Sequence, residues 1–286
     1  RNQIWCFMGC FHGMTLGALA LTSDSGSRGG AGINLENVTH LPAPYMFPEL
    51  DTIKYIETLL TDDHSGTEKP AAIILETVQA EGGVQVFDAQ WLRDLRALCD
   101  KYDILLIVDD IQVGCARTGT FFSFERAGIV PDIVVMSKSI GGYGLPFALT
   151  LFRPELDVWT PGEHNGTFRG NQLAMVAAKA GLEFMLDNHV EAEVKRKEQI
   201  VRDFMEREIE PLGVKVRGIG LIWGIEMADG EASAAVSKAC FDKGLIIERA
   251  GRDNNVVKLM PALTIPDDQL QRGLEIIAES VREVLA

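Results

Sequence analysis

The chain is poor in cysteine, histidine and basic residues, and each shortage excludes a class of protein. Its 286 residues include five cysteines, an odd number spread along the sequence, which excludes a disulfide framework and predicts a reducing compartment, the cytoplasm. Lys and Arg total 27 against 41 Asp and Glu, giving a formal net charge of −14. This balance argues against binding to nucleic acid or to anionic membrane surfaces, which both favour basic proteins. No apolar run approaches the ~20 residues of a membrane span.

Several motifs with well-defined chemistry are also absent. The glycines of Gly26–Gly30 have neither the spacing nor the preceding strand of a nucleotide-binding loop. The GxSxG motif of α/β-hydrolases does not occur. The five histidines show no metal-ligand spacing, and Cys6 and Cys10 have no second ligand pair nearby. We therefore interpret both cysteines as small buried residues and predict no metal site.

Short apolar runs alternate with amphipathic segments over most of the chain. The runs that predict strands are Ile4–Phe7, Ala71–Leu75, Ile104–Val108, Asp132–Met136 and Gly144–Phe152. Helical spacing of apolar residues predicts helices over Ala89–Tyr102 and within 170–209. Apolar strands separated by helices indicate a mostly parallel sheet covered on both faces. Functional sites in such sheets lie beyond the carboxyl ends of the strands.

After Pro211 the pattern changes to a mixture of short strands and helices. The predicted strands are Val214–Val216, Leu221–Met227, Leu245–Arg249 and Val256–Leu259, and the predicted helices are Glu231–Lys243 and Pro266–Leu285. We predict an α/β chain with a large domain at 1–212 and a small α+β domain at 213–286. The chain opens at Arg1 and enters a buried strand almost at once, so we expect that a preceding segment is missing.

Lys138 is the first candidate for chemistry, because it comes just after the buried strand Asp132–Met136. Ammonium groups avoid apolar surroundings, and desolvation lowers the pKa of a lysine and frees its amine as a nucleophile. The glycines that follow allow close approach of the backbone to a ligand. The alternative is a lysine that extends to the surface from the strand end, and position alone favours that alternative.

Two further candidates follow predicted elements. Asp109 ends the run Ile104–Val108 and lies three residues before Gln112, so both can face a bound cation or a protonated ring, or can be solvated turn residues. Thr167 and its neighbouring glycines precede a long helix. Such a segment can bind phosphate, and it can equally be a helix cap without a ligand.

Three more residues come from loops after strands. Phe11 can stack on a flat cofactor or belong to the core, and His12 can be a buried histidine with its hydrogen bonds satisfied. Glu81, in the segment Glu76–Gly83, can point inward or occupy a surface turn. None of these local signals decides between its two interpretations.

Taken together and in order, these segments resemble the class III (ω-type) pyridoxal-phosphate aminotransferases of fold type I. The matching segments are FHG at Phe11–Gly13, ETVQAEGG at Glu76–Gly83, VDDIQVGCARTG at Val108–Gly119, PDIVVMSKSIGGYGLPFA at Pro131–Ala148 and NGTFRGN at Asn165–Asn171. Several ordered matches are more specific than any single one, and they favour the functional interpretations. The resemblance implies the PLP-dependent transferase fold, the cofactor pyridoxal 5'-phosphate (PLP), amino-acid and oxo-acid substrates, and a homodimer with active sites at its interface.

The resemblance also implies roles for individual residues. Lys138 and Asp109 match the catalytic residues, so Lys138 is expected to carry PLP covalently and to move a proton, and Asp109 to pair with the pyridine nitrogen. The other expected cofactor contacts are Gln112 to the phenolic oxygen, Phe11 and His12 at the ring, and Thr167, from the neighbouring subunit, to the phosphate.

Within the family, the stretches HGMTLGALALTSDS, GEHNGTFRG and VVKLMPALTIPDDQL resemble the branch that acts on 2,4-diaminobutyrate and serves ectoine biosynthesis. The implied reaction transfers an amino group from L-glutamate to L-aspartate 4-semialdehyde. Alternatives are an aminotransferase for ornithine, acetylornithine or GABA, a PLP aminomutase, and a catalytically silent PLP-fold module.

Two departures from the family pattern concern the substrate. Ornithine- and GABA-type members have an arginine in the strand that here reads Val256–Leu259, and Lys258 offers a point charge in place of a planar fork. Glu81 matches the acid that pairs with that arginine. Arg169 stands where many members have glycine. We predict that Arg169, together with Lys258, binds a substrate carboxylate.

Overall fold

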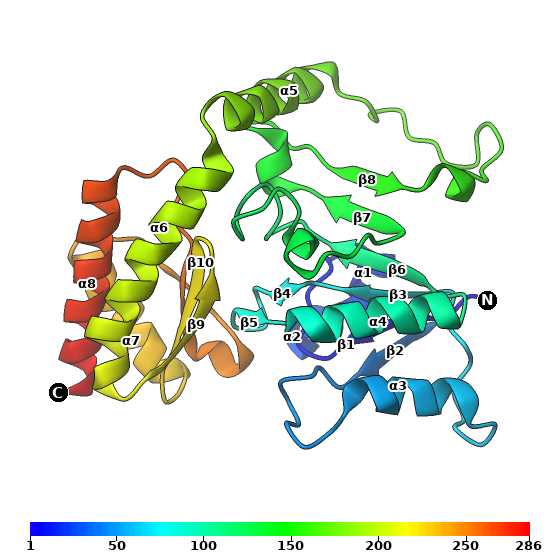
Figure 1. Cartoon of the computed structure of the whole chain (residues 1–286), viewed down its shortest axis with the longest axis horizontal. Helices are drawn as coiled ribbons and strands as arrows, with labels where there is room; N and C mark the ends of the chain where they lie inside the picture. The colour runs from blue at the N-terminus through cyan, green and yellow to red at the C-terminus, as the bar shows by residue number, and fades with distance from the viewer.

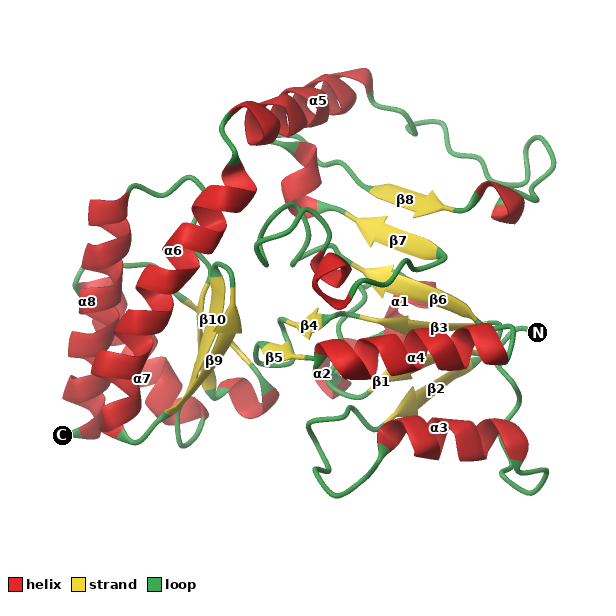
Figure 2. Ribbon diagram, viewed as in Figure 1, coloured by secondary structure: helices red, strands yellow, loops and turns green.

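The computed structural model describes all 286 residues and contains two main sheets (Figure 1, Figure 2). The larger sheet has six strands in the order β2-β1-β3-β6-β7-β8. Its strands are β1 (Ile4–Phe7), β2 (Val38–Leu41), β3 (Ala72–Leu75), β6 (Leu105–Asp109), β7 (Ile133–Met136) and β8 (Leu149–Phe152). All neighbouring pairs are parallel except β7 and β8, which are antiparallel. This is the mostly parallel sheet that the sequence predicts.

The faces of this sheet follow from the alternation of side chains along each strand. Trp5 and Phe7 of β1 belong to a core of 22 buried residues on the side of α3 (Thr52–Thr61) and α4 (Ala89–Lys101). Cys6, between them, faces the other side, where the buried cluster has three members. The helices α1 (Leu16–Leu21) and α2 (Ser25–Gly29) follow β1; α1 contacts that second side, and α2 packs against α1.

Helix α4 illustrates why these segments are helical. Asp88 caps its first turn, because its carboxylate accepts hydrogen bonds from the backbone N–H groups of Gln90 and Trp91. Leu92, Leu95 and Cys99 recur at helical spacing and are buried against the sheet.

The second sheet has four antiparallel strands in the order β11-β12-β10-β9. They are β9 (Lys215–Ile219), β10 (Ile222–Glu226), β11 (Glu248–Ala250) and β12 (Val256–Leu259). Three helices pack against this sheet: α6 (Val190–Phe204), α7 (Gly230–Asp242) and α8 (Asp267–Leu285).

The remaining elements connect the two sheets or lie in loops. Helix α5 (Gln172–Asp187) precedes α6, and a short hairpin, β4 (Val78–Gln79) with β5 (Gln85–Val86), lies between the sheets (Figure 1). Single helical turns occupy Ser123–Ala127, Lys138–Gly141, Pro154–Leu156, Met205–Ile209, Glu210–Leu212 and Arg252–Asn254.

The second core has 21 buried residues, and α6 contributes to it through Val190, Val194, Val201 and Phe204. The division at 212/213 stays a prediction. The packing of α6 favours an earlier division, between α5 and α6.

Two predicted strands begin later in the structure, and one strand of the large sheet was not predicted. The strand predicted over Gly144–Phe152 begins at Leu149, because Gly144 has φ 93° and Pro146 interrupts the extended chain. The strand predicted over Leu245–Arg249 begins at Glu248, because Leu245 still donates its N–H to Cys240 at the end of α7. Strand β2 was not predicted, since Val-Thr-His-Leu is not an apolar run.

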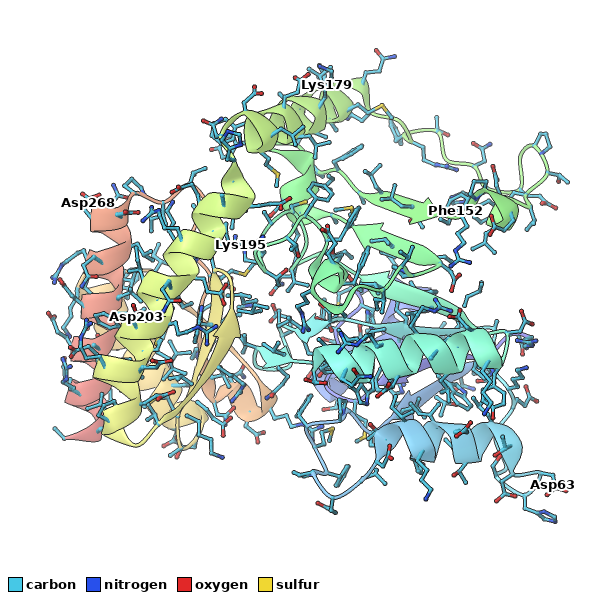
Figure 3. The ribbon with its side chains drawn as sticks, viewed as in Figure 1. Asp63, Phe152, Lys179, Lys195, Asp203 and Asp268 are labelled. Atoms are coloured by element: carbon cyan, nitrogen blue, oxygen red, sulfur yellow. The ribbon has the colours of Figure 1, made fainter.

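The outer helices carry charged residues. Lys179 on α5, Lys195 and Asp203 on α6, and Asp268 on α8 are exposed on these helices (Figure 3). No helix combines the length and apolarity that crossing a membrane requires.

Candidate active site

The candidate residues of the large sheet gather at the carboxyl ends of its strands. Asp109 is the last residue of β6, and Lys138 follows β7 by two residues. Because β6 and β7 are paired in parallel, with Asp109 opposite Val135, these two residues lie on the same edge of the sheet. Phe11 and His12 follow β1 at that edge. The structure therefore brings together residues that are far apart in the sequence.

Asp109 and His12 form a buried pair. His12 Nδ1 lies 2.8 Å from Asp109 Oδ2, and their side chains are 1% and 6% exposed. Asp109 Oδ1 also accepts a hydrogen bond from the N–H of Ile111 at 3.1 Å. Burial alone lowers the pKa of His12, but the hydrogen bond to Asp109 and the nearby Cys10 outweigh it and raise the pKa to about 10. His12 is therefore cationic at neutral pH, and its Nδ1–H donates a hydrogen bond to Asp109 Oδ2.

Glu76 is a buried carboxylate that the sequence analysis did not select. It accepts hydrogen bonds from the N–H of Phe11 at 2.9 Å and of Ala80 at 3.3 Å. Burial raises its pKa to about 8, and the charge of His12 opposes that shift. Glu76 follows β3 directly, as Asp109 ends β6, so its place at a strand end was a signal that could have found it.

Lys138 lies in an exposed turn, in line with the alternative that its position alone favoured. The strand ends at Met136, and the turn Lys138–Gly141 carries the side chain outward. Lys138 has φ 52°, a left-handed conformation that is uncommon for a residue with a side chain. No carboxylate pairs with its amine in this chain. An outlier of this kind at a strand end is typical of a functional residue.

Glu81, Gln112 and Lys258 form a second charged cluster, between the two sheets. Lys258 Nζ lies 2.7 Å from Glu81 Oε1, and Gln112 Nε2 donates to the same oxygen at 3.0 Å. Lys258 also lies 3.4 Å from Gln112 Oε1 and 3.2 Å from Glu248 Oε2. The Lys258 side chain is 1% exposed, and those of Glu81 and Glu248 are 38% and 74% exposed.

The charge of Glu81 is set by its neighbours. Burial raises its pKa, but the hydrogen bonds and charges of Lys258, with Gln112 and the charge of Lys138, outweigh burial and lower it. Lys138 is thus close enough to act on Glu81. The sequence analysis missed Glu248, because its contact depends on the pairing of β11 with β12, in which Glu248 is opposite Lys258.

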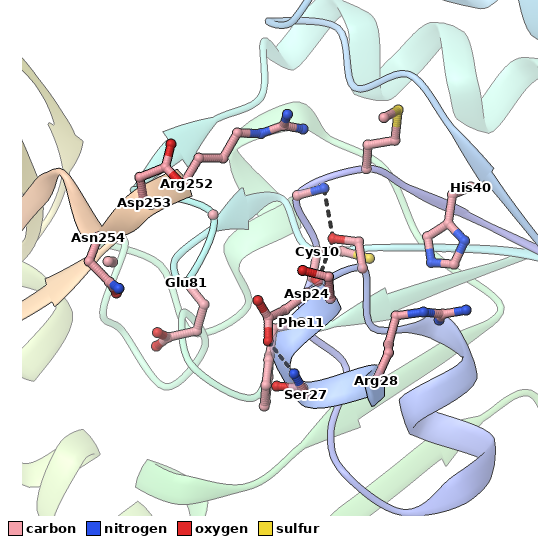
Figure 4. A pocket seen from close by; sticks show the side chains of 17 residues that line it. Cys10, Phe11, Asp24, Ser27, Arg28, His40, Glu81, Arg252, Asp253 and Asn254 are labelled. Atoms are coloured by element: carbon pink, nitrogen blue, oxygen red, sulfur yellow. Dashed lines mark hydrogen bonds between the residues drawn. The ribbon is translucent and has the colours of Figure 1, made fainter. Parts of the chain in front are cut away.

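Backbone contacts place the Glu81 loop against the small sheet. The N–H of Gly251 donates to Glu81 O at 2.9 Å, and Arg217 Nε donates to Gly83 O at 2.8 Å. Gly83 has φ 99°, and a Cβ there would lie 3.1 Å from Gly251 Cα. This position therefore requires glycine. On its other side the loop borders a cavity of about 820 Å³ that Phe11 also lines (Figure 4).

Thr167 and Arg169 lie elsewhere. They belong to the exposed segment between β8 and α5, which runs at the far side of the large sheet from β12 (Figure 1). The Arg169 side chain donates to the carbonyl of His164 within its own segment. Within one chain, no hydrogen bond or ion pair joins Arg169 to Lys258 or Thr167 to Lys138.

Comparison with known proteins decides how this geometry is interpreted. The sequence profile described as "Aminotransferase class-III" matches residues 1–281. The chain belongs to the class-III aminotransferase family. Two curated relatives are diaminobutyrate–2-oxoglutarate transaminases. The Bordetella parapertussis protein is 50% identical and is matched over 100% of this chain and 67% of its own length. The Streptomyces coelicolor protein is 51% identical, with 99% and 68% covered.

Solved aminotransferase structures share this fold. The Toxoplasma gondii ornithine aminotransferase is 26% identical with a TM-score of 0.87, covering 99% of this chain and 65% of that one. An (S)-enantioselective ω-transaminase from Thermomicrobium roseum is 26% identical with a TM-score of 0.88, covering 99% and 68%. The chain thus has the PLP-dependent transferase fold and spans about two thirds of the length of its curated relatives.

Class-III aminotransferases depend on PLP, and the residues present fit that cofactor. A primary amine without a partner, at Lys138, suits a covalent bond to an aldehyde. A buried carboxylate, Asp109, whose other partner is His12, suits a protonated ring nitrogen. Both stand at one edge of the sheet, and Phe11 follows β1 at the same edge, with β3 between β1 and β6.

Proposed function

We propose that this chain carries the PLP site of a diaminobutyrate–2-oxoglutarate transaminase. The reaction transfers the amino group of L-glutamate to L-aspartate 4-semialdehyde and yields L-2,4-diaminobutyrate and 2-oxoglutarate. The supporting observation is the common edge of β6 and β7, where Asp109 and Lys138 stand with the Glu81–Lys258 pair near Lys138. The name and the ~50% identity of the curated relatives support the choice of substrate.

Each residue at the large sheet has a distinct role in this proposal. When bound, PLP supplies a ring that withdraws electrons from the substrate carbon. Lys138 Nζ would take the proton from that carbon and deliver it to C4′ of the cofactor. Asp109 holds the ring nitrogen, His12 fixes the orientation of Asp109, and Phe11 stacks on the ring. The remaining cofactor contacts are Gln112 at the phenolic oxygen and Thr167 at the phosphate.

Substrate recognition falls to the cluster around Lys258. A buried ammonium group can bind the carboxylate of glutamate once its own partner moves aside, and Glu81 is partly exposed and able to move. Glu81 can in turn pair with the free ammonium group of diaminobutyrate. Arg169 joins this site only from a second subunit, because within one chain its side chain donates to the carbonyl of His164 in its own segment.

We also propose a homodimer, in keeping with the exposed apolar surface around β8 and α5. Large apolar side chains that are at least 67% exposed concentrate between residues 143 and 186: Tyr143, Val158, Phe168, Leu173, Val176 and Leu186. Contiguous apolar surface of this kind marks an interface. Phe168→Glu should shift the protein toward monomer in light scattering, and Val130→Glu, at another exposed apolar residue, should not. A dimer that survives Phe168→Glu unchanged would place the interface elsewhere.

The test of the function is a half-reaction. The protein is loaded with PLP, and the absorbance of the lysine-bound cofactor is followed after addition of 2,4-diaminobutyrate, ornithine or GABA. We expect conversion to the aminated cofactor to be fastest with diaminobutyrate and absent in Lys138→Gln. A faster reaction with ornithine or GABA would retain the family chemistry and overturn the substrate. Absence of the cofactor band would favour a silent module.

The compartment and pathway belong to this proposal as well. All five cysteines are free thiols, which is typical of a reducing cytoplasm. The product is the diamine that ectoine biosynthesis consumes, so that pathway is the proposed context.

A further inference from the structure

Cys6, Cys10 and His40 lie together on the face of the large sheet opposite α4. Cys6 and His40 are paired in register across the parallel strands β1 and β2. After β1 the chain turns back, with the N–H of Cys10 donating to Phe7 O at 3.3 Å, which places Cys10 beside Cys6. Their ligand atoms, two sulfurs and an imidazole nitrogen, all lie within 4.8 Å of one another.

These three side chains are available as ligands. Both cysteines are buried, free thiols. His40 Nε2 is buried and has no hydrogen-bond partner. A buried polar atom without a partner costs about 1–3 kcal/mol, so an unpaired nitrogen next to two thiols needs an explanation.

We propose that Cys6, Cys10 and His40 bind a zinc ion. Two thiolates and one imidazole are a donor set that Zn²⁺ prefers over harder oxygen ligands. With Zn–S of ~2.3 Å and Zn–N of ~2.0 Å, ligand atoms around one tetrahedral ion are roughly 3.5–4 Å apart, which the cluster meets with small side-chain rotations. Binding releases one proton from each thiol, and the two thiolates neutralise the ion, so the buried site carries no net charge.

The surroundings provide a fourth ligand and a route of entry. Leu21 O lies 2.9 Å from Cys10 Sγ and 3.4 Å from Cys6 Sγ. Arg28 holds that loop by donating from Nη1 to three carbonyls, those of Leu19, Ala20 and Thr22. Either this carbonyl or a water molecule can complete the tetrahedron. Cys10 and His40 also line the cavity of about 820 Å³, through which an ion can enter (Figure 4).

The other cluster of possible ligands differs in kind. Asp62, Asp63 and His64 are exposed, follow one another in a surface turn, and His64 Nδ1 already lies 2.6 Å from Asp63. They offer two hard oxygen ligands to solvent, where water competes with them. This turn serves as the internal comparison for the test.

The test measures zinc directly. The protein is purified from zinc-supplemented cells, dialysed against a weak chelator, and analysed for metal by mass spectrometry. We expect a single zinc ion per chain. Replacement of zinc by Co²⁺ should add sulfur-to-cobalt charge-transfer absorption, recorded as a difference from the zinc form so that cofactor absorption cancels.

Matched variants locate the ion. Cys6→Ser, Cys10→Ser and His40→Gln should each weaken zinc binding by more than ~100-fold, beyond the ~10–100-fold typical of residues that only orient ligands. Cys99→Ser and Cys240→Ser change buried free cysteines elsewhere and should retain zinc. If Cys6→Ser fails to fold, judged by circular dichroism, His40→Gln decides, because His40 is only half-buried.

Two results would overturn the proposal. The first is a wild-type protein without zinc after the chelator step. The second is zinc that survives His40→Gln and Cys10→Ser and is lost in His64→Ala, which would assign the ion to the exposed turn. Neither depends on transaminase activity, so the zinc site and the proposed function can fail separately.

Discussion

The two ion pairs of the candidate active site differ in the exposure of their side chains to solvent. In the His12–Asp109 pair both side chains are enclosed, at 1% and 6% exposure. In the Lys258–Glu81 pair the cation is enclosed, at 1%, but Glu81 is 38% exposed and the second acid, Glu248, is 74% exposed. We call His12–Asp109 the closed pair, because both of its side chains are shielded from solvent. We call Lys258–Glu81 the open pair, because its acids are in contact with solvent.

This difference matches the two tasks that the site has to perform. A closed pair cannot exchange partners without exposing a buried charge, so it suits a group that stays in place, the cofactor. An open pair can release its acid to water, so its cation becomes free for a carboxylate that arrives and leaves. Class-III aminotransferases need both, since the cofactor remains while two substrates alternate.

Removing the cation of the closed pair should have the largest effect. His12→Leu leaves the Asp109 carboxylate buried with only the N–H of Ile111 as a partner. Breaking a buried pair in this way costs about 3–5 kcal/mol. We expect that loss in the free energy of unfolding, measured with urea at pH 7.

Removing the acid of the closed pair should mainly affect catalysis. Asp109→Asn keeps the shape of the side chain but replaces the carboxylate that we propose to pair with the ring nitrogen. We expect kcat to fall by ~100-fold or more, as for the loss of one electrostatic contact in other active sites. Asp110→Asn is the control, because Asp110 is equally buried but bonds Ser123, and we expect near-normal kcat. Equal losses in both variants would remove the special role of Asp109.

The sequence predicted the large sheet and the residues at its strand ends well, for a physical reason. Strands buried on both faces are continuous apolar runs, and the residue where each run stops is the residue at the edge. Asp109 and Lys138 are visible in this way. The pairing of Lys258 with Glu81 joins residues 177 apart and depends on how the Glu81 loop docks on the small sheet, which no local pattern contains.

The sequence did not predict contacts and side-chain exposure that depend on neighbouring strands or on the local backbone conformation. The cluster of Cys6, Cys10 and His40, for which we propose zinc, could not be predicted because His40 belongs to β2, a strand without an apolar run. The position of Lys138 after a buried strand left open whether its side chain is buried or reaches the surface. The outward turn after Met136 depends on left-handed backbone at Lys138, which residue type alone does not predict.

Replacing Lys258, the cation of the open pair, should affect substrate binding more than the free energy of unfolding. In Lys258→Met, Glu81 can turn to water, so we expect the free energy of unfolding to change little. The KM for glutamate should rise ~10–100-fold, because a hydrogen bond to a charged group contributes about 1.5–3 kcal/mol. Lys258→Arg keeps the charge and should restore most of the affinity. An unchanged KM in Lys258→Met would separate this lysine from substrate binding.

Replacing Glu81, the acid of the open pair, should have the smallest effect. We expect it in the way the free energy of unfolding depends on pH. The pKa of Glu81 is lower in the folded chain than its usual value of 4.5, so its pairing stabilises the fold above that pH and is lost as the pH falls through the folded pKa. Because Glu81 is partly exposed, we expect less than ~1 kcal/mol. The measurement is the difference in the free energy of unfolding between wild type and Glu81→Gln from pH 3 to pH 7, which should grow with pH and level off above about 5. Glu248→Gln, at the more exposed acid, should show no such rise. A flat difference for Glu81→Gln would mean that Lys258 does not hold this carboxylate in the absence of substrate.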